Sequence, residues 1–148
     1  MLTLLTGNLF TTPGLDALAH GVNCSGKMGK GIALEFRRRW PRMFTRYQQL
    51  CDQGELSPGN LFSFRARDDL WIYNLATQDR PGPRASLDAI GLATGAMVIS
   101  MIDKGIRRVG MPRVGSGLGG LDFDLVRPVL EGVAERYPAV ELVVVSRV

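Results

Sequence analysis

The segment GVNCSGKMGKGIALEF, residues 21–36, constrains the fold of this chain more than any other stretch. An apolar run leads into it, and the residues after it repeat their apolar positions at helical spacing. Glycine adopts backbone angles that other residues avoid and leaves room for a ligand beside the main chain. Free N–H groups at the start of a helix attract anions, and two of the chain's three lysines lie here. The segment therefore predicts a strand, a loop that binds an anion such as phosphate, and a helix.

Strand and helix patterns alternate along the rest of the chain. Short apolar runs predict strands over residues 2–7, 17–22, 61–66, 70–76, 107–114 and 141–148. Helical spacing predicts helices over residues 32–40, 41–51, 87–104 and 123–133. Such alternation is typical of helices packed on both faces of a largely parallel sheet. We therefore expect an α/β fold, a three-layer α/β/α sandwich with a mixed, mainly parallel central sheet.

Local signals mark where the helices begin. Pro41 suits a first helical position, because its missing N–H would have no helical partner there. Ser86 and Asp122 are expected to be N-caps. Pro128 lies near enough to the start of the last helix to be tolerated, or else it bends the first turns. The apolar side of that helix, expected to face the core, consists of Leu125, Val126, Val129, Leu130 and Val133.

A second glycine-rich segment, GSGLGG at residues 115–120, also joins an expected strand to an expected helix. In open α/β sheets, ligands bind outside the carboxyl ends of the strands, where both segments are expected to lie. Neither segment carries the G-x-x-x-x-G-K-[ST] pattern of a P-loop. One such loop is often an ordinary tight turn, but two favour an extended phosphate ligand, and a diphosphate is the natural candidate.

Composition narrows the class of protein. With 148 residues, 45% of them apolar and 22% charged, the chain is expected to form a single domain over residues 1–148. No run approaches the length that crosses a bilayer, and the N-terminus lacks the features of a signal peptide. Cys24 and Cys51 suggest buried, reduced thiols and a cytoplasmic protein. The net charge of +4 allows weak binding to polyanions, but no nucleic-acid-binding signature accompanies it, so that function ranks last.

Several separate motifs together resemble one family, the macrodomains. They are GNLF at residues 7–10, VNCSGKMGKGIALEF at 22–36, PRMF at 41–44, NLAT at 74–77 and MPRVGSGLGGLDFDLV at 111–126. The likeness runs in the family's order from Gly7 to about Leu130. Within the family, the chain is similar to the branch that holds the terminal ADP-ribose glycohydrolases and the macrodomains of DarG antitoxins. The resemblance implies that ADP-ribose binds in a cleft along the top of the sheet.

The resemblance also implies roles for individual residues. Asn8 stands where many macrodomains carry an aspartate that accepts a hydrogen bond from the adenine amino group, and Leu9 adds a backbone amide. Asn23 and Ser25 fall where the family contacts the distal ribose; without the resemblance, Asn23 would be an ordinary turn-forming residue. The residues expected to bind the rest of ADP-ribose, chiefly its diphosphate, are Met28, Gly29, Lys30, Gly31, Ile32, Arg113, Gly115, Ser116, Gly117, Leu118 and Gly119.

The sequence departs from the glycohydrolase branch at two positions that carry its chemistry. Where that branch has a lysine after the NLxT-like strand end, this chain has Gln78. Where the terminal ADP-ribose glycohydrolases have an aspartate in the second loop, this chain has Gly119. An amide cannot act as a nucleophilic amine or form a Schiff base. The sequence therefore argues against a covalent mechanism driven by a lysine at that position.

Other chemically capable side chains have simpler explanations. Asp122 is explained as an N-cap, and Asp79 as a solvated loop charge. His20, in an apolar strand, is explained as a buried core histidine, and Cys24 as a small packed side chain. We therefore expect any hydrolysis to be substrate-assisted, with the ribose and a water held close together and the diphosphate helping to orient that water. The candidate catalytic residues are Asn23, Gln78 and Asp79.

The expected function is hydrolysis of a mono-ADP-ribosyl linkage by this non-covalent route. The alternatives are a non-catalytic ADP-ribose reader, favoured by the missing lysine and aspartate, and an ADP-ribose 1''-phosphate phosphatase. The lack of a second module to be targeted favours the enzyme. The expected partner is ADP-ribose, or a protein or nucleic acid that carries one ADP-ribose. We expect a monomer with no membrane association, no metal and no cofactor.

Overall fold

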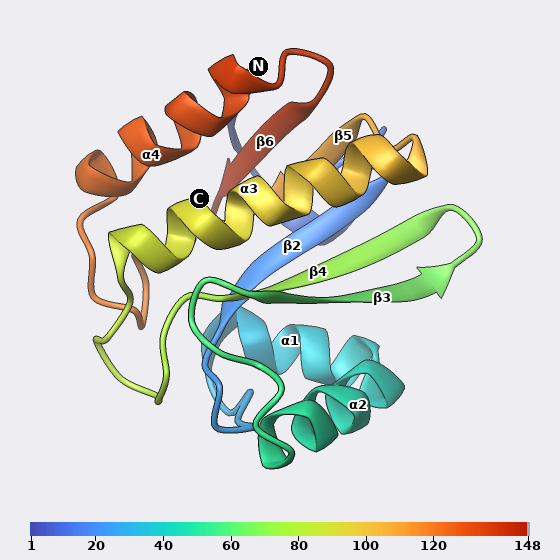
Figure 1. Ribbon diagram of the computed structural model, residues 1–148. Helices are drawn as coiled ribbons and strands as arrows, with labels where there is room; N and C mark the ends of the chain where they lie inside the picture. The colour runs from blue at the N-terminus through green and yellow to red at the C-terminus, as the bar shows by residue number, and fades with distance from the viewer. Residues whose placement is uncertain (148) are drawn as a thin grey trace.

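The apolar runs form the strands of one sheet. The computed structural model describes residues 1–147. Its strands are β1 (Leu2–Thr6), β2 (Ala17–Val22), β3 (Leu61–Arg67), β4 (Leu70–Ala76), β5 (Arg108–Met111) and β6 (Glu141–Ser146). They lie in the order β1-β6-β5-β2-β4-β3. Neighbours are parallel throughout, except that the edge strand β3 is antiparallel to β4 (Figure 1). The sheet is therefore mixed and mainly parallel, as predicted.

Helices cover both faces of this sheet. They are α1 (Gly31–Arg39), α2 (Pro41–Asp52), α3 (Leu87–Lys104) and α4 (Phe123–Arg136), with a short 3-10 helix, η1 (Leu9–Thr11), that the sequence patterns did not predict. α3 and α4 lie on one face, and α1 and α2 on the other (Figure 1). The predicted three-layer α/β/α sandwich is confirmed.

The alternating side chains of the inner strands explain why both layers form. Along β6, Leu142 and Val144 are buried against α3 and α4, whereas Val143 and Val145 are buried in the cluster under α1 and α2. Strands that are buried on both faces read as continuous apolar runs, which is the pattern seen in the sequence. This double burial fixes the positions of the strand ends, from which the loops described below emerge.

The predicted helix starts agree with the structure. Pro41 is the first residue of α2. The Ser86 side chain accepts a hydrogen bond from Ala89 N at 3.2 Å and caps α3. The Asp122 side chain accepts one from Asp124 N at 2.9 Å and caps α4. Pro128 lies inside α4, within its first two turns.

Some predicted boundaries and orientations were wrong. β5 ends at Met111 rather than at residue 114, because Pro112 follows and has no N–H to donate to the sheet. Leu125 does not face the core: it is 55% exposed, because the buried side of α4 is centred on Val126 and Leu130. The last predicted strand, 141–148, ends at Ser146, and its final residue lies outside the described residues. Over residues 1–147, no helix is long and apolar enough to span a bilayer.

Candidate functional site

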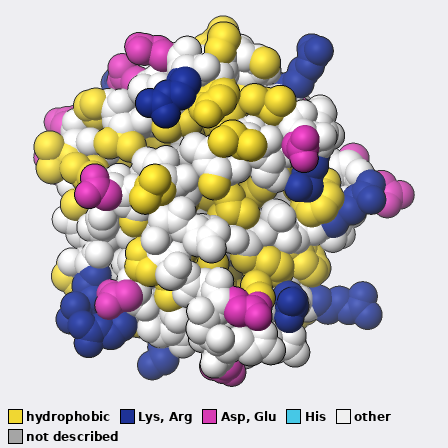
Figure 2. Space-filling view, viewed as in Figure 1, with side chains coloured by type: hydrophobic (Ala, Val, Ile, Leu, Met, Phe, Trp, Pro, Cys, Tyr) yellow, Lys and Arg dark blue, Asp and Glu magenta, His cyan; other side chains and the backbone are white. Residues whose placement is uncertain are grey.

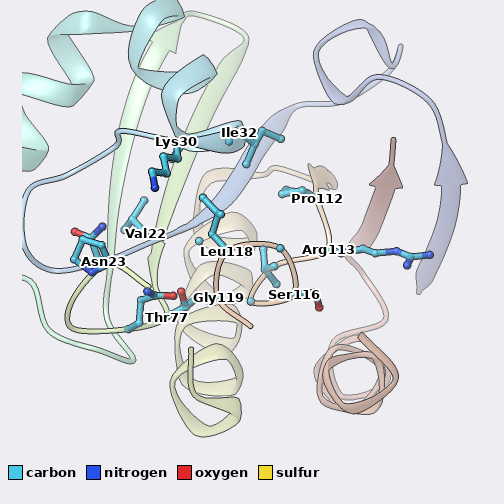
Figure 3. Close-up of a pocket in the computed structure, with 18 of the residues that line it drawn as sticks. Val22, Asn23, Lys30, Ile32, Thr77, Pro112, Arg113, Ser116, Leu118 and Gly119 are labelled. Atoms are coloured by element: carbon cyan, nitrogen blue, oxygen red, sulfur yellow. The ribbon is translucent and has the colours of Figure 1, made fainter. Parts of the chain in front are cut away.

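A cleft of about 1070 Å³ opens at the carboxyl ends of the parallel strands. Residues at or just after the ends of β1, β2, β4, β5 and β6 all contribute to its wall. These strand-end residues are Thr6, Val22, Asn23, Thr77, Gln78, Pro112, Arg113, Val145 and Ser146. The site therefore lies where parallel α/β sheets generally bind their ligands. Figure 3 shows that the labelled residues come from both glycine loops and from the strand ends between them.

The first glycine loop, residues 23–30, is organised around the side chain of Asn23. Its Oδ1 accepts a hydrogen bond from Ser25 N at 3.0 Å, and its Nδ2 donates to Lys27 O at 2.8 Å. The buried phenol oxygen of Tyr47 lies 2.8 Å from the same Oδ1 and 2.7 Å from Asn23 O. Burial raises the pKa of the Tyr47 phenol, which therefore stays a neutral donor. Asn23 is thus largely committed to shaping the loop, with one amide N–H left over.

The loop ends at the N-terminus of α1, which opens into the cleft. Lys30 is the N-cap of α1, and its side chain makes no capping hydrogen bond. The first-turn residues 31–33 all line the cleft. Because N–H groups in the first turn of a helix have no helical partners, they are available to an anion there. Gly31 has a φ of +59°, a conformation that favours glycine.

The second glycine loop, residues 115–120, faces the first across the cleft. Leu121 N donates to Gly115 O at 2.9 Å and closes the loop. A Cβ atom on Gly31 would lie 3.3 Å from Leu118 Cδ1, so the tip of the second loop reaches over the start of α1. Figure 3 shows Leu118 between the Lys30 side and the Ser116 side of the cleft. The Ser116 Oγ is buried and has no hydrogen-bond partner within residues 1–147, which suits a ligand oxygen.

The charged residues of the described lining are all cations. The charged residues in the lining are Lys27, Lys30, Arg113 and Arg147, and no aspartate or glutamate of the described chain contributes to it. Two of these cations interact with other side chains of the protein: Arg113 Nε donates to Ser146 Oγ at 2.8 Å, and Arg147 pairs with Glu35. On the face shown in Figure 2, basic and acidic side chains are interspersed. The cleft is therefore suited to an anion but offers no carboxylate base.

Most of the predicted site residues lie in the cleft lining. The predicted ligand-binding residues found there are Leu9, Asn23, Gly29, Lys30, Gly31, Ile32, Arg113, Gly115, Ser116, Gly117, Leu118 and Gly119, together with the candidate catalytic residue Gln78. The structure thus brings together two loops that are more than 80 residues apart in the sequence. Their contact with a ligand stays a prediction.

Four other predicted residues lie outside the lining, each with a structural role. Asn8 accepts a hydrogen bond from Phe10 N at 2.9 Å and caps η1. Ser25 Oγ donates to Asp79 O at 2.8 Å, and Met28 is buried in the core under α1 and α2. The Asp79 carboxylate is exposed and pairs with Arg80 at 3.5 Å.

The sequence patterns missed several lining residues. Thr6 and Ser146 could have been found by applying the strand-end rule to every predicted strand. Pro81, Gly82 and Pro83 line the cleft from a segment for which the sequence patterns predicted neither a strand nor a helix. Tyr47, which supports the first loop from α2, lies within the predicted helix 41–51, and no signal in the sequence distinguished it.

His20 is a core histidine, as predicted. Its ring is buried, stacks on Phe36 at a centroid distance of 3.9 Å, and its Nε2 lies 2.7 Å from Asn74 Oδ1. Burial lowers the pKa of His20 to about 4, so the ring is neutral at physiological pH. It is not part of the cleft lining.

The two cysteines are half-buried rather than buried, contrary to the sequence-based expectation. Cys24 lies in the first loop but outside the cleft lining. Burial raises the pKa of the Cys24 thiol to about 11, which leaves almost none of it as the nucleophilic thiolate at neutral pH. The structure therefore gives no support to a cysteine nucleophile.

Comparison with known proteins agrees with this geometry. The family model named Macro domain matches residues 19–130. The chain is 37% identical to a DNA ADP-ribosyl glycohydrolase of Mycobacterium tuberculosis, over 97% of this chain and 42% of that protein. It is 31% identical to the human ADP-ribose glycohydrolase OARD1, over 90% of this chain and 84% of that protein. The macrodomain of Mycobacterium tuberculosis DarG superposes with a TM-score of 0.89 at 33% identity, over 98% of this chain and 97% of that one. The chain thus spans less than half the length of the mycobacterial glycohydrolase.

Proposed function

Since the chain belongs to the Macro domain family, we propose that it binds ADP-ribose in the strand-end cleft and hydrolyses a mono-ADP-ribosyl linkage. The observation that carries the proposal is the cleft itself. It combines two glycine loops, an uncapped helix N-terminus and four cationic side chains, with no carboxylate in the described lining. Such a site is complementary to a diphosphate.

The ligand has a natural orientation in this cleft. The diphosphate would lie between residues 29–32 and residues 115–119, where backbone N–H groups and Lys30 are close. The adenosine would extend toward Leu9 and Arg147, and the distal ribose toward Asn23 and Gln78. The two relatives named above are glycohydrolases, which supports cleavage at the distal ribose as the reaction.

The lining favours a mechanism that depends on how the attacking water and the distal ribose are positioned. Because no carboxylate belongs to the described lining, an attacking water would be oriented by the ligand's own diphosphate and by fixed polar groups such as the Asn23 and Gln78 amides. Holding water and ribose at near-attack distance can supply much of the rate enhancement without a strong base. The reaction would break the bond between the anomeric carbon and the modified group, and water would supply the new hydroxyl and the proton.

The test is mass spectrometry of a panel of mono-ADP-ribosylated substrates after incubation with the protein. The panel should contain glutamate, serine, arginine, thymidine and guanosine linkages. We expect release of free ADP-ribose from at least one linkage. Binding of ADP-ribose with every linkage intact would instead establish a reader. The predicted monomeric state and cytoplasmic location are further parts of the proposal, which light scattering and cell fractionation would test.

A further inference from the structure

One segment, residues 77–86, bridges the two glycine loops. At its start, Asp79 O accepts hydrogen bonds from Cys24 N at 3.0 Å and from Ser25 Oγ at 2.8 Å, both in the first loop. Near its end, Ala85 N donates to Gly119 O of the second loop at 3.2 Å. We call residues 77–86 the bridging segment. Any shift within it is transmitted to both sides of the cleft.

The bridging segment also packs directly on the second loop. A Cβ atom on Gly120 would lie 2.5 Å from Pro83 Cβ, and one on Gly119 would lie 2.9 Å from Ala85 Cβ. There is therefore no spare room between the bridging segment and the second loop. The position of Pro83 and Ala85 fixes the position of the second loop.

Gln78 holds the middle of the bridging segment in place. Its Nε2 donates hydrogen bonds to Arg80 O at 2.7 Å and to Gly82 O at 2.8 Å. Both partners are carbonyl oxygens, so only the NH₂ end of the amide can satisfy them, and both of its protons are used. The orientation of the amide is therefore fixed. Its Oε1 makes no hydrogen bond within residues 1–147, on a side chain that lines the cleft.

We propose that Gln78 is a positioning residue with two separable functions. Its NH₂ group closes the turn at residues 80–82 and so sets the distance between the two glycine loops. Its Oε1 accepts a hydrogen bond from a ribose hydroxyl or a water in the cleft. The second function rests on the proposed ADP-ribose binding, whereas the first depends on the protein alone.

Limited trypsin digestion without ligand tests the first function. Arg80 precedes a proline and its bond resists trypsin, so the Arg84–Ala85 bond reports on the bridging segment. The substitution Gln78→Met removes both hydrogen bonds and keeps a side chain of similar size. We expect cleavage after Arg84 to become faster by about tenfold or more. Gln78→Lys adds a trypsin site at position 78, so this variant and the wild type are compared with an arginine-specific protease. Cleavage after Arg84 should stay near the wild-type rate, because an ammonium group can donate to both carbonyls. Gln49→Met, at an exposed site on α2, is the matched control and should change nothing.

Steady-state hydrolysis tests the second function. Gln78→Arg retains donors, has no acceptor and, unlike a lysine, cannot act as a nucleophilic amine, so we expect a KM that is not raised and a kcat about tenfold lower. Gln78→Met should impair both parameters, because the loops separate as well. If the wild type binds without hydrolysing, the ratio of the affinity for ADP-ribose to that for ADP replaces kcat, because the added charge acts on the diphosphate of both ligands. Gln78→Arg should lower this ratio several-fold.

The outcomes separate this proposal from the proposed function. Wild-type resistance to trypsin in Gln78→Met would overturn the first function, whether or not the protein binds ADP-ribose. A kcat or an affinity ratio in Gln78→Arg that is not lower than in the wild type would overturn the second. A wild type that neither binds nor cleaves any ADP-ribosyl compound would overturn the proposed function and the acceptor role with it, while the trypsin result still decides the first function.

Discussion

The phenol oxygen of Tyr47 lies 2.8 Å from Oδ1 of Asn23, so a residue on α2 determines the shape of the first glycine loop. Tyr47 is fully buried, and the Asn23 side chain also bonds Ser25 N and Lys27 O. The loop that is expected to meet the ligand is therefore supported from the core side of the molecule. The local sequence predicts only that Asn23 forms a turn. The hydrogen bond from Tyr47, 24 residues along the chain, is what holds its side chain in place.

Tyr47→Phe is predicted to damage both stability and binding. Removal of the hydroxyl takes its donor from Asn23 O and leaves Oδ1 with its backbone donors alone, which should cost about 1–2 kcal/mol of unfolding free energy. ADP-ribose affinity should fall several-fold because the loop loosens. Urea denaturation and calorimetry give the two quantities. Tyr73→Phe is the matched control: its hydroxyl bonds Ser100 at 2.9 Å under α3, so it should lower stability and leave affinity unchanged.

Free ADP-ribose is predicted to bind with a Kd of about 1 μM, roughly −8 kcal/mol, and AMP far more weakly. The reason is that the cleft's two glycine loops lie on opposite sides of a space suited to a diphosphate plus a second ribose. Isothermal titration calorimetry measures both ligands. An absence of heat and of any thermal shift at millimolar ADP-ribose would remove the basis of the proposed function.

Gly117→Glu is predicted to abolish ADP-ribose binding in a folded protein. A Cβ atom on Gly117 would meet nothing within 4 Å, so the backbone tolerates it, while the carboxylate repels the phosphates. Circular dichroism checks the fold and calorimetry the binding, with Gly117→Ala as the uncharged control. Normal binding by folded Gly117→Glu would place the phosphates elsewhere.

Gly115→Ala should behave differently from the substitutions at Gly117. Gly115 has a φ of +77°, and an added Cβ would lie 2.5 Å from Ile90 Cδ1, so the substitution should destabilise the protein by about 1–2 kcal/mol.

The sequence was most informative where local chemistry decides the structure. The two glycine loops, the caps at Ser86 and Asp122 and the Pro41 helix start each depend on a few adjacent residues, and all lie where they were predicted. The sequence did not predict contacts between segments that are distant along the chain. The bridging segment reads as a polar, proline-rich loop, and its bonds to both glycine loops exist only in the folded chain.

Acid is predicted to destabilise the protein through His20, the chain's one histidine. Burial lowers its pKa from 6.5 to about 4, so the unfolded chain binds the proton more readily than the folded one. His20 therefore opposes folding increasingly as the pH falls below about 6.5, and its penalty levels off only below about pH 4. Between pH 7 and pH 5 it should cost about 2 kcal/mol of unfolding free energy. Denaturant titrations measure the loss, and NMR should show an imidazole that stays neutral at pH 5; a signal that titrates near pH 6.5 would contradict the prediction.

Hydrolysis is predicted to proceed without a covalent adduct to the protein. The amines in the lining, Lys27 and Lys30, are exposed side chains on the first loop, whose expected partner is the diphosphate rather than the anomeric carbon. Asp79→Ala should retain near wild-type rates, because that carboxylate is exposed and paired with Arg80 outside the lining. Intact-mass spectrometry after borohydride treatment of a reacting mixture should therefore show unmodified protein beside free ADP-ribose. A trapped adduct that disappears in Lys27→Arg or Lys30→Arg would establish a lysine nucleophile. Release of inorganic phosphate from ADP-ribose 1''-phosphate, with every glycosidic linkage intact, would show that the cleft cleaves a different bond.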